Sequence, residues 1–311
     1  MGRYLVTGGC GFIGSHLTER LLKDGHDVVI VDDLSTGQRE NVPKDMQVIV
    51  GNVCDTNTFK DEIAKIDGCI HLAAVSSVER SRVDWLGTHE ANLSGFVGLM
   101  DAITKSPRAG MPISYASSAA VYGDNTHLPL AETSATKPLS AYGADKLGCE
   151  QHAFIGGVTH GLSTTGFRFF NIYGPRQDPT SPYSGVISIF AKRMIDGEAV
   201  TIFGDGEQTR DFVYVGDAVE ALTASLKRDG AASAVFNVCS GRSITINSLM
   251  WTLAQILDYE QPANYADARP GEIRHSLGDA TQLKTVLGVK ADTPLTLGLK
   301  TTTDWMKKTR R

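Results

Sequence analysis

A glycine-rich stretch near the start of the chain reads Thr7-Gly8-Gly9-Cys10-Gly11-Phe12-Ile13-Gly14. It follows a short apolar run, Tyr4-Leu5-Val6, which is typical of a buried strand. It also opens a segment in which Ile13, Leu17 and Leu21 share one helical face. A strand, a glycine turn and a helix in this order predict a place where an anion meets a helix N-terminus.

The glycines of this stretch have distinct physical roles. The first makes a tight turn, the second lets the backbone approach a pyrophosphate, and the third lets helix and strand pack closely. Asp32 ends the next apolar run, where a carboxylate binds the ribose hydroxyls of a dinucleotide. Because Asp33 adds a negative charge that repels a 2′-phosphate, the pattern predicts NAD rather than NADP. The predicted cofactor contacts here are Gly8, Gly11, Phe12, Ile13, Gly14, Asp32 and Asp33.

Short apolar runs alternate with helical patterns through the first half of the chain. We predict buried strands at 4–6, 28–31, 48–50, 69–72, 113–115 and 167–170, and helices at 12–22 and 92–103. Buried strands that alternate with helices predict an α/β fold, a doubly wound parallel Rossmann sheet with helices on both faces. Asn52 and Val53 follow the third run and are either adenine contacts or part of a plain loop.

The second half of the chain differs from the first in composition and in its predicted elements. Pro/Gly/Ser-rich loops at 175–185, a helix near 187–195 and strands around 200–203 predict a smaller mixed α/β domain for the substrate. We place the NAD-binding domain at 1–172 and the substrate domain at 173–311. Segments near 211–240 (a helix at 217–226, a strand at 236–238) are expected to return to the first domain, so that the two are interleaved.

The composition narrows the class of protein. The chain has 311 residues, of which 41% are hydrophobic and 21% charged, and its net charge is -5. We therefore expect no nucleic-acid partner, because no basic field exists, and no membrane partner, because no apolar run is long enough. We expect no signal peptide, because the strand pattern begins at Tyr4. Five scattered cysteines without a CxxC pair predict neither a disulfide scaffold nor a metal site, and favour a cytoplasmic location.

A second constellation suggests chemistry. Tyr142 and Lys146 are one helical turn apart, so on a helix they share a face. A phenol has a pKa of roughly 10 in water, and a nearby ammonium and a positive nicotinamide ring lower it. Ser117-Ser118 ends the fifth predicted strand, at the edge where doubly wound sheets bind ligands. Such a tyrosine removes the proton of an alcohol while hydride leaves its carbon.

The chain resembles the extended short-chain dehydrogenase/reductases over essentially its whole length, and among them the UDP-hexose 4-epimerases. Its matching motifs are residues 7–14, Asp32, His71-Leu72-Ala73-Ala74, Ser117-Ser118-Ala119-Ala120-Val121-Tyr122-Gly123, Tyr142-xxx-Lys146, Arg168-Phe169-Phe170-Asn171, Thr201-Ile202-Phe203-Gly204-Asp205-Gly206, Arg210-Asp211-Phe212-Val213 and Arg269-Pro270-Gly271-Glu272.

The resemblance implies roles for these residues. Tyr142 would take the proton of the sugar 4-hydroxyl, Lys146 would hold the nicotinamide ribose, and Ser118 would hydrogen-bond the same hydroxyl. The 4-keto sugar would then turn over and receive the hydride on its other face, so that tightly bound NAD is regenerated. Further NAD contacts implied by the family are Leu72, Ala73, Ala74 and Asn92.

For the nucleotide-sugar, the resemblance implies contacts from the second half of the chain. Arg210 and Arg269 would clamp the diphosphate, a task suited to the donor fork of guanidinium. The remaining implied contacts are Asn171 (diphosphate-sugar), Val186 and Ile187 (uracil, through their backbone), Phe203 (uracil), Glu272 (uridine ribose), and Ser77 and Val78 (sugar). Two of them could instead have structural roles: Phe203 as a core residue, and Arg210 as a partner of Asp211.

Ser276 bears on substrate choice. Several glucose-specific relatives carry a bulky tyrosine at this place, and a serine leaves room for an N-acetyl group at C2. The segment Arg274-His275-Ser276-Leu277 also resembles epimerases that favour N-acetylated sugars. We therefore predict UDP-GlcNAc and UDP-GalNAc as substrates, with residual action on UDP-glucose and UDP-galactose, since large pockets exclude small groups poorly.

Three other functions share the fold. A 4,6-dehydratase needs an acid and a base where this chain has Ala119-Ala120. A UDP-glucuronate 4-epimerase or decarboxylase needs a cation for the sugar carboxylate, for which Arg80, Arg82 or Arg274 could serve. An NAD-sensing binding protein would typically have lost the Tyr142 and Lys146 pair. The family further implies a homodimer through helices at 92–103 and 149–155.

Overall fold

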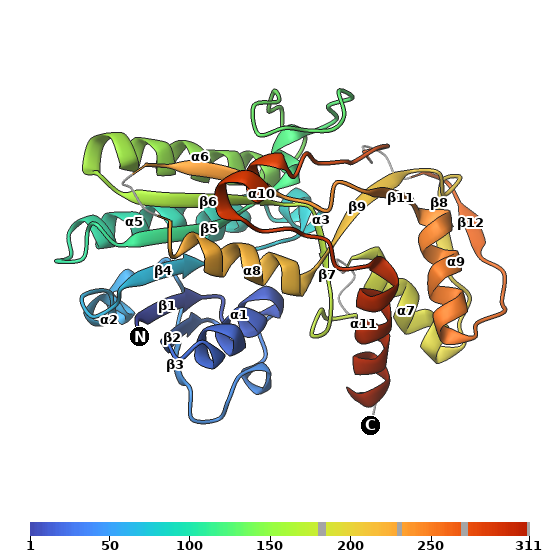
Figure 1. Ribbon diagram of the computed structural model, residues 1–311, viewed down its shortest axis with the longest axis horizontal. Coiled ribbons are helices and arrows are strands. Elements are labelled where there is room, and N and C mark those ends of the chain that lie inside the picture. Colours follow the sequence, from blue (N-terminus) through green and yellow to red (C-terminus); the bar gives the residue numbers. More distant parts are fainter. Residues whose placement is uncertain (180–184, 229–231, 269–272, 310–311) are drawn as a thin grey trace.

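The computed structural model describes residues 1–179, 185–228, 232–268 and 273–309. Its largest sheet is parallel and seven-stranded, and it lies on the left in Figure 1. The sheet has the order β10-β6-β5-β4-β1-β2-β3. Its strands are β1 (Arg3–Thr7), β2 (Asp27–Asp32), β3 (Gln47–Val50), β4 (Gly68–His71), β5 (Pro112–Ser118), β6 (Ser163–Phe169) and β10 (Ala234–Val238). The predicted Rossmann sheet is confirmed. Its strand order reverses between β1 and β4, and sheets of this kind bind ligands at the carboxyl ends of the strands beside this reversal.

Successive residues of each strand enter two different cores. Val6 and Ile30 pack with α1 (Phe12–Lys23) and α8 (Val215–Ser225). Their neighbours Leu5 and Val29 pack with α5 (Gly95–Thr104) and α6 (Ala141–His160) on the other face. Because both faces are covered by helices, the strands read as continuous apolar runs rather than as alternating patterns.

Short elements lie in the connections between the strands. They are η1 (Arg39–Asn41), η2 (Thr56–Thr58), α2 (Lys60–Ile63), α3 (Val78–Val83), α4 (Trp85–His89), the π-helical turn η3 (Glu90–Ser94) and η4 (Ala119–Tyr122). The helix predicted from residue 92 begins inside the π-helical turn and continues as α5. No helix in the described ranges combines the length and the apolar character that crossing a bilayer requires.

The second half builds a third core. Strands β7 (Asn171–Tyr173), β9 (Thr209–Tyr214) and β11 (Ser243–Thr245) form one sheet, and β8 (Thr201–Phe203) pairs with β12 (Asn264–Ala266). Helices α7 (Val186–Asp196), α9 (Ile246–Leu257) and α11 (Leu295–Thr309) surround them, while α10 (Thr281–Leu287) packs near β10. Helix α8 lies on α1, and β10 pairs with β6. The predicted division at residue 172, with segments near 211–240 returning to the first domain, stays a prediction.

Candidate active site

The glycine stretch forms the turn between β1 and α1. Gly8 has a φ of +69°, which glycine adopts without strain, and its N–H donates to the carbonyl of Val31 at 2.8 Å. A Cβ on Gly14 would lie 2.1 Å from the carbonyl oxygen of Gly8, so only glycine lets the helix approach the turn. Gly11 precedes α1 and provides no side-chain cap. No side chain at the cap position accepts hydrogen bonds from the first backbone N–H groups of α1. These N–H groups can therefore bind a pyrophosphate.

Asp32 ends β2 next to this turn and is buried. One carboxylate oxygen accepts from the N–H of Cys10 and the other from the N–H of Leu34, each at 2.9 Å. Burial raises the pKa of Asp32, although these two hydrogen bonds oppose the rise. Gly37 leaves the space in front, since a Cβ there would lie 2.7 Å from the carboxylate. The carboxylate is held rigidly and keeps lone pairs for ribose hydroxyls.

The other predicted cofactor contacts lie at the same edge of the sheet. Asp33 is exposed and accepts from the N–H and hydroxyl of Ser35. Asn52 accepts from the N–H of Cys54, and Val53 is buried. Leu72, Ala73 and Ala74 follow β4 and are half-buried. Asn92 is buried with its amide engaged by the backbone of Val75, at 2.7 and 3.0 Å. Their contacts with NAD stay predictions.

The proposed proton-transfer residues come from two adjacent elements. Ser140 caps α6 by accepting from the N–H of Gly143 at 3.0 Å, which starts the helix just before Tyr142. The ammonium of Lys146 lies 5.9 Å from the ring centroid of Tyr142, as predicted for neighbours on one helical face. Ser118 stands at the end of β5, where its hydroxyl accepts from the N–H of Ala120.

Lys146 is 2% exposed. One of its neighbours is His71, for which the sequence predicted no separate role. His71 lies on β4, and burial together with the charge of Lys146 lowers its pKa to about 3. Its Nδ1 lies 2.8 Å from the hydroxyl oxygen of Thr7, which also accepts from the N–H of Ala73. The signals in the sequence were a polar residue inside an apolar strand and its place in the motif His71-Leu72-Ala73-Ala74. The neutral ring thus connects the ends of β1 and β4 beneath the site.

The predicted substrate contacts belong to several elements of the second half and to α3. Asn171 opens β7 and is exposed, and Phe203 ends β8 half-buried. Val186 begins α7, with Ile187 buried in the third core. Ser77 caps α3 by accepting from the N–H of Arg80. The remaining positions are Val78, which is half exposed, and Arg269 and Glu272, which lie outside the described residues.

The backbone of Ser276 pairs with Thr209, the residue that precedes Arg210 on β9. Arg210 follows Thr209 on β9, and the N–H of Ser276 donates to the carbonyl of Thr209 at 3.2 Å. Ser276 is half-buried. Asp211 is fully buried and accepts from the backbone of Ser240, Gly241 and Gly278. These donors, which the sequence pattern did not indicate, satisfy the carboxylate that could have been the structural partner of Arg210.

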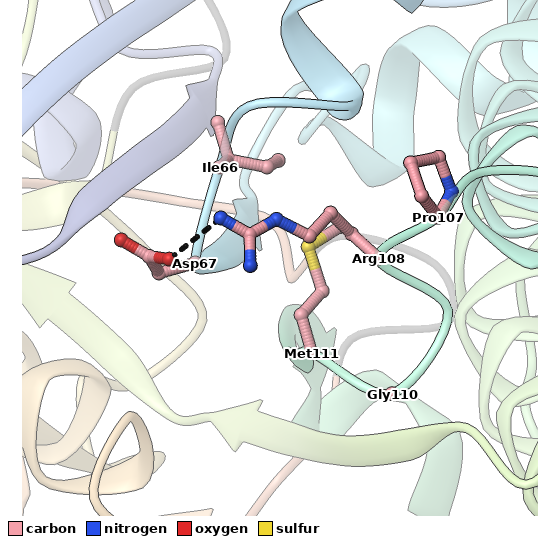
Figure 2. A pocket seen from close by; sticks show the side chains of 6 residues that line it. All are labelled: Ile66, Asp67, Pro107, Arg108, Gly110 and Met111. Atoms are coloured by element: carbon pink, nitrogen blue, oxygen red, sulfur yellow. Dashed lines mark hydrogen bonds and ion pairs between the residues drawn. The ribbon is translucent and has the colours of Figure 1, made fainter.

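One cavity of about 290 Å³ lies away from all these residues (Figure 2). It is next to the amino ends of β4 and β5, where Arg108 donates to the carboxylate of Asp67 at 3.1 Å. None of its lining residues is a predicted site residue. The amino edge of the sheet therefore does not contribute to the candidate active site.

A model of the NAD dependent epimerase/dehydratase family matches residues 4–239. The chain belongs to this family. A putative UDP-glucose 4-epimerase of Methanocaldococcus jannaschii is 33% identical to it over 99% of both chains. A UDP-N-acetyl-alpha-D-glucosaminuronate decarboxylase of Bacillus cytotoxicus is 31% identical over 98% of both.

Solved structures of the epimerase/dehydratase family resemble the whole chain. The UDP-glucose 4-epimerase of Thermotoga maritima with UDP-glucose has a TM-score of 0.95 at 35% identity, covering 99% of this chain and 100% of the other. The UDP-N-acetylglucosamine 4-epimerase of Methanobrevibacter ruminantium in complex with UDP-N-acetylmuramic acid has a TM-score of 0.94 at 34% identity, covering 99% of each. These likenesses confirm the predicted family and its cofactor, NAD.

The geometry of the cofactor end fits NAD. The left-handed turn at Gly8, the bare helix start after Gly11 and the rigid carboxylate of Asp32 form one continuous edge. An anion suits the first two features and a pair of hydroxyls suits the third. The protein is therefore an NAD-dependent enzyme of the epimerase type.

Proposed function

We propose that the protein catalyses the 4-epimerisation of a UDP-hexose. The observation that carries this proposal is the placement of Tyr142 and Lys146 on one face of α6, with Ser118 at the end of the neighbouring strand β5. These groups can remove a proton from an alcohol oxygen and return it later. They stand at the same sheet edge as the turn and the carboxylate that fit NAD.

In the proposed mechanism Tyr142 and Ser118 act on the sugar 4-oxygen, and Lys146 acts on Tyr142. The Tyr142 phenolate takes the hydroxyl proton, and Ser118 donates a hydrogen bond to that oxygen and orients it. The buried Lys146 ammonium favours the phenolate by its charge. NAD, when bound, supplies the hydride acceptor and donor at C4. After the 4-keto sugar presents its other face, Tyr142 returns the proton to the oxygen.

Proton NMR of the purified protein tests this function. We expect UDP-GlcNAc to give its 4-epimer without added NAD, because a cofactor that is regenerated in every cycle stays bound. A second tube with UDP-glucose reports the breadth of the pocket. Conversion in neither tube, with NAD supplied as well, would contradict the proposal.

For the substrate we propose UDP-GlcNAc and UDP-GalNAc, with residual turnover of UDP-glucose and UDP-galactose. The half-buried Ser276 supports this choice, because its small side chain lies next to β9 and leaves room for an N-acetyl group. The neighbouring Arg274 forms a two-fold ion pair with Asp205 at 2.7 and 2.8 Å, which fixes the segment.

A second candidate function is the 4-epimerisation or decarboxylation of a UDP-uronate. The position of Arg80 favours it. Of the three arginines that could bind the sugar carboxylate, Arg82 pairs with Glu79 and Arg274 with Asp205. Arg80 is half-buried in α3, beside Ser77, and has no ion-pair partner in the described parts of the chain. Incubation with UDP-glucuronate tests this candidate. Arg80→Met would abolish turnover of the uronate and spare turnover of the neutral sugar.

A dehydratase and a protein that only senses NAD have less support. A dehydratase would need an acid and a base at Ala119 and Ala120, which carry only methyl groups on η4. A protein that only senses NAD would have no use for the buried Lys146 next to Tyr142. A cytoplasmic location stays a prediction, in keeping with five cysteines that are all thiols.

We further propose a homodimer formed through α6. Phe154, Ile155 and Val158 on this helix are exposed, at 60%, 49% and 70%. Trp85 and Leu86 on α4, which contacts α6, are exposed as well, and exposed apolar side chains on two neighbouring helices suit a second copy of the chain. In α5, which the family also implies, the large apolar side chains are buried against the sheet.

Light scattering after gel filtration tests the dimer. Changing Phe154 and Val158 to glutamate is expected to give a monomer. Trp251→Glu is the matched control, since Trp251 is equally exposed on the distant α9. A double variant that keeps the mass of a dimer would contradict this interface.

A further inference from the structure

A buried ion pair ties α6 to β6 one helical turn beyond Lys146. Glu150 accepts from Arg168 through both carboxylate oxygens, with Arg168 Nε at 2.9 Å and Nη2 at 2.7 Å. The two side chains are only 5% and 7% exposed. The hydroxyl of Ser117 on β5 donates to the same carboxylate at 2.5 Å. One carboxylate thus connects α6 with two strands that lie side by side beneath it (Figure 1).

We call Glu150, Arg168 and Ser117 the junction. Glu150 lies on the same helix as the proposed proton-transfer residues Tyr142 and Lys146. Residues four apart share a face of an α-helix, so Tyr142, Lys146 and Glu150 stand in one row along α6. On β5, Ser117 immediately precedes Ser118. The junction therefore joins the row that carries the proposed base to the strand that carries the proposed hydroxyl partner.

Arg168 also holds the chain between these two elements. Its Nη1 donates to the hydroxyl of Tyr122 and to the carbonyl of Glu132, both at 2.9 Å. Tyr122 belongs to η4, directly after Ser118, and Glu132 lies in the loop that leads to α6. A single guanidinium thus fixes the turn, the loop and the helix between Ser118 and Lys146.

Stability alone is a poor explanation of such a junction. Taking two charges out of water costs several kcal/mol, and apolar residues of similar volume are often as stabilising. Burial works against the charge of Arg168, but the hydrogen bonds and charge of Glu150 outweigh it and raise the pKa of Arg168. The Arg168 guanidinium therefore keeps its charge, and its hydrogen bonds to Glu150 have fixed directions, which apolar packing would not provide.

We propose that Glu150 and Arg168 are positioning residues, which set the distance between Ser118 on β5 and the Tyr142 and Lys146 face of α6. The inference rests on the proposed function, because it assigns these three residues to proton transfer. A displacement of about 1 Å between reacting groups costs about 10²-fold in rate. Substrate contacts on other elements are not affected by such a displacement, so kcat changes and KM does not.

The experiment replaces the whole polar junction by apolar residues in one variant: Ser117→Ala, Glu150→Leu and Arg168→Met. Tyr122 keeps its hydrogen bond to Asn237 Oδ1 at 2.6 Å, so no hydroxyl is left buried without a partner. The matched control is Ser114→Ala with Ser225→Ala. That hydroxyl pair, 2.7 Å apart, ties the opposite face of β5 to α8, which carries no proposed catalytic residue.

Three measurements are made on both proteins and on the wild type: Tm, steady-state kinetics, and backbone hydrogen exchange over residues 118–150. For the triple variant we expect a Tm near that of the wild type, a kcat lower by about 10²-fold with KM within about threefold, and faster exchange over 118–150. The control is expected to keep the kcat and the exchange of the wild type. Glu150→Asp keeps a carboxylate on a side chain that is one methylene shorter. Its kcat is expected to fall less than that of the triple variant.

Two results would overturn the inference. One is a triple variant with the kcat and exchange of the wild type. The other is a control that loses as much kcat as the triple variant, since any buried polar tie to β5 would then have the same effect. A wild type that converts no UDP-sugar would overturn the proposed function instead, and hydrogen exchange over 118–150 would then decide the positioning inference by itself.

Discussion

The two ends of the candidate site differ in how firmly the fold holds them. At the cofactor end, Asp32 and Lys146 are 6% and 2% exposed, and the carboxylate of Asp32 is fixed by two backbone N–H groups. At the substrate end, Asn171 and Val78 are exposed, and Ser276 is attached by a backbone hydrogen bond to Thr209. The difference suggests that the fold determines cofactor and chemistry, while loops determine which sugar is accepted.

The largest expected effect is a loss of reaction rate without a loss of NAD binding. Tyr142→Phe removes the group that takes the hydroxyl proton, and general base catalysis contributes about 10²–10⁴-fold. We expect kcat to fall by about 10³-fold while NAD binding, measured by fluorescence titration, is unchanged. Tyr265→Phe, at an exposed position of β12, serves as the control. Loss of less than about tenfold would contradict the role of Tyr142.

The next effect concerns the substrate end alone. Ser276→Tyr fills the space proposed for the N-acetyl group, and we expect turnover of UDP-GlcNAc to be abolished while turnover of UDP-glucose persists. The ratio of the two kcat/KM values should change by at least about 10²-fold, and Ser276→Ala should leave it unchanged. If both activities survive Ser276→Tyr unchanged, the residue that selects the sugar lies elsewhere.

A smaller effect is expected at the cofactor end. Asp32→Asn removes the charge that strengthens hydrogen bonds to ribose hydroxyls, a contribution of about 1.5–3 kcal/mol per bond. NAD affinity should fall by about 10- to 100-fold, as measured by calorimetry. Asp33→Asn, at the exposed neighbour, should change the affinity by less than about threefold. Equal losses in both variants would remove the special role of Asp32.

The smallest effect is a pH dependence of stability. The pKa of His71 is lowered from 6.5 to about 3 in the folded protein, so the unfolded chain binds a proton between these values and the folded protein does not. The contribution of the neutral ring is complete above pH 6.5 and is lost as the pH falls toward 3. We expect Tm to fall less steeply below about pH 6 in His71→Asn than in the wild type. Parallel curves would contradict this role of the neutral ring.

Much of the first half could be predicted from the sequence, because its signals are local. The strand at Tyr4, the glycine turn and the helix after it follow from apolar period and glycine spacing, and the structure confirms them. The Tyr142 and Lys146 neighbourhood follows from helical spacing alone. These features need no knowledge of distant residues.

The rest depends on contacts between residues far apart in the chain. Two of these contacts join segments whose sequences do not predict that they pair: β8 with β12, and Glu150 with Arg168. The burial of His71 likewise depends on distant residues that pack around it. Arg168 stood inside a recognised motif, yet its partner Glu150 is visible only once α6 lies across β5 and β6. Arg269 and Glu272 lie outside the described residues, so their roles stay predictions.

The proposed reaction is tested most directly by following the hydrogen at C4. The purified protein, without added NAD, is incubated in ordinary water with UDP-GlcNAc that carries deuterium at C4, and the product is examined by NMR. We predict the 4-epimer with deuterium still at C4, because the same hydride leaves and returns. A product with a solvent proton at C4, or no 4-epimer from this or any other UDP-hexose, would contradict the proposed mechanism.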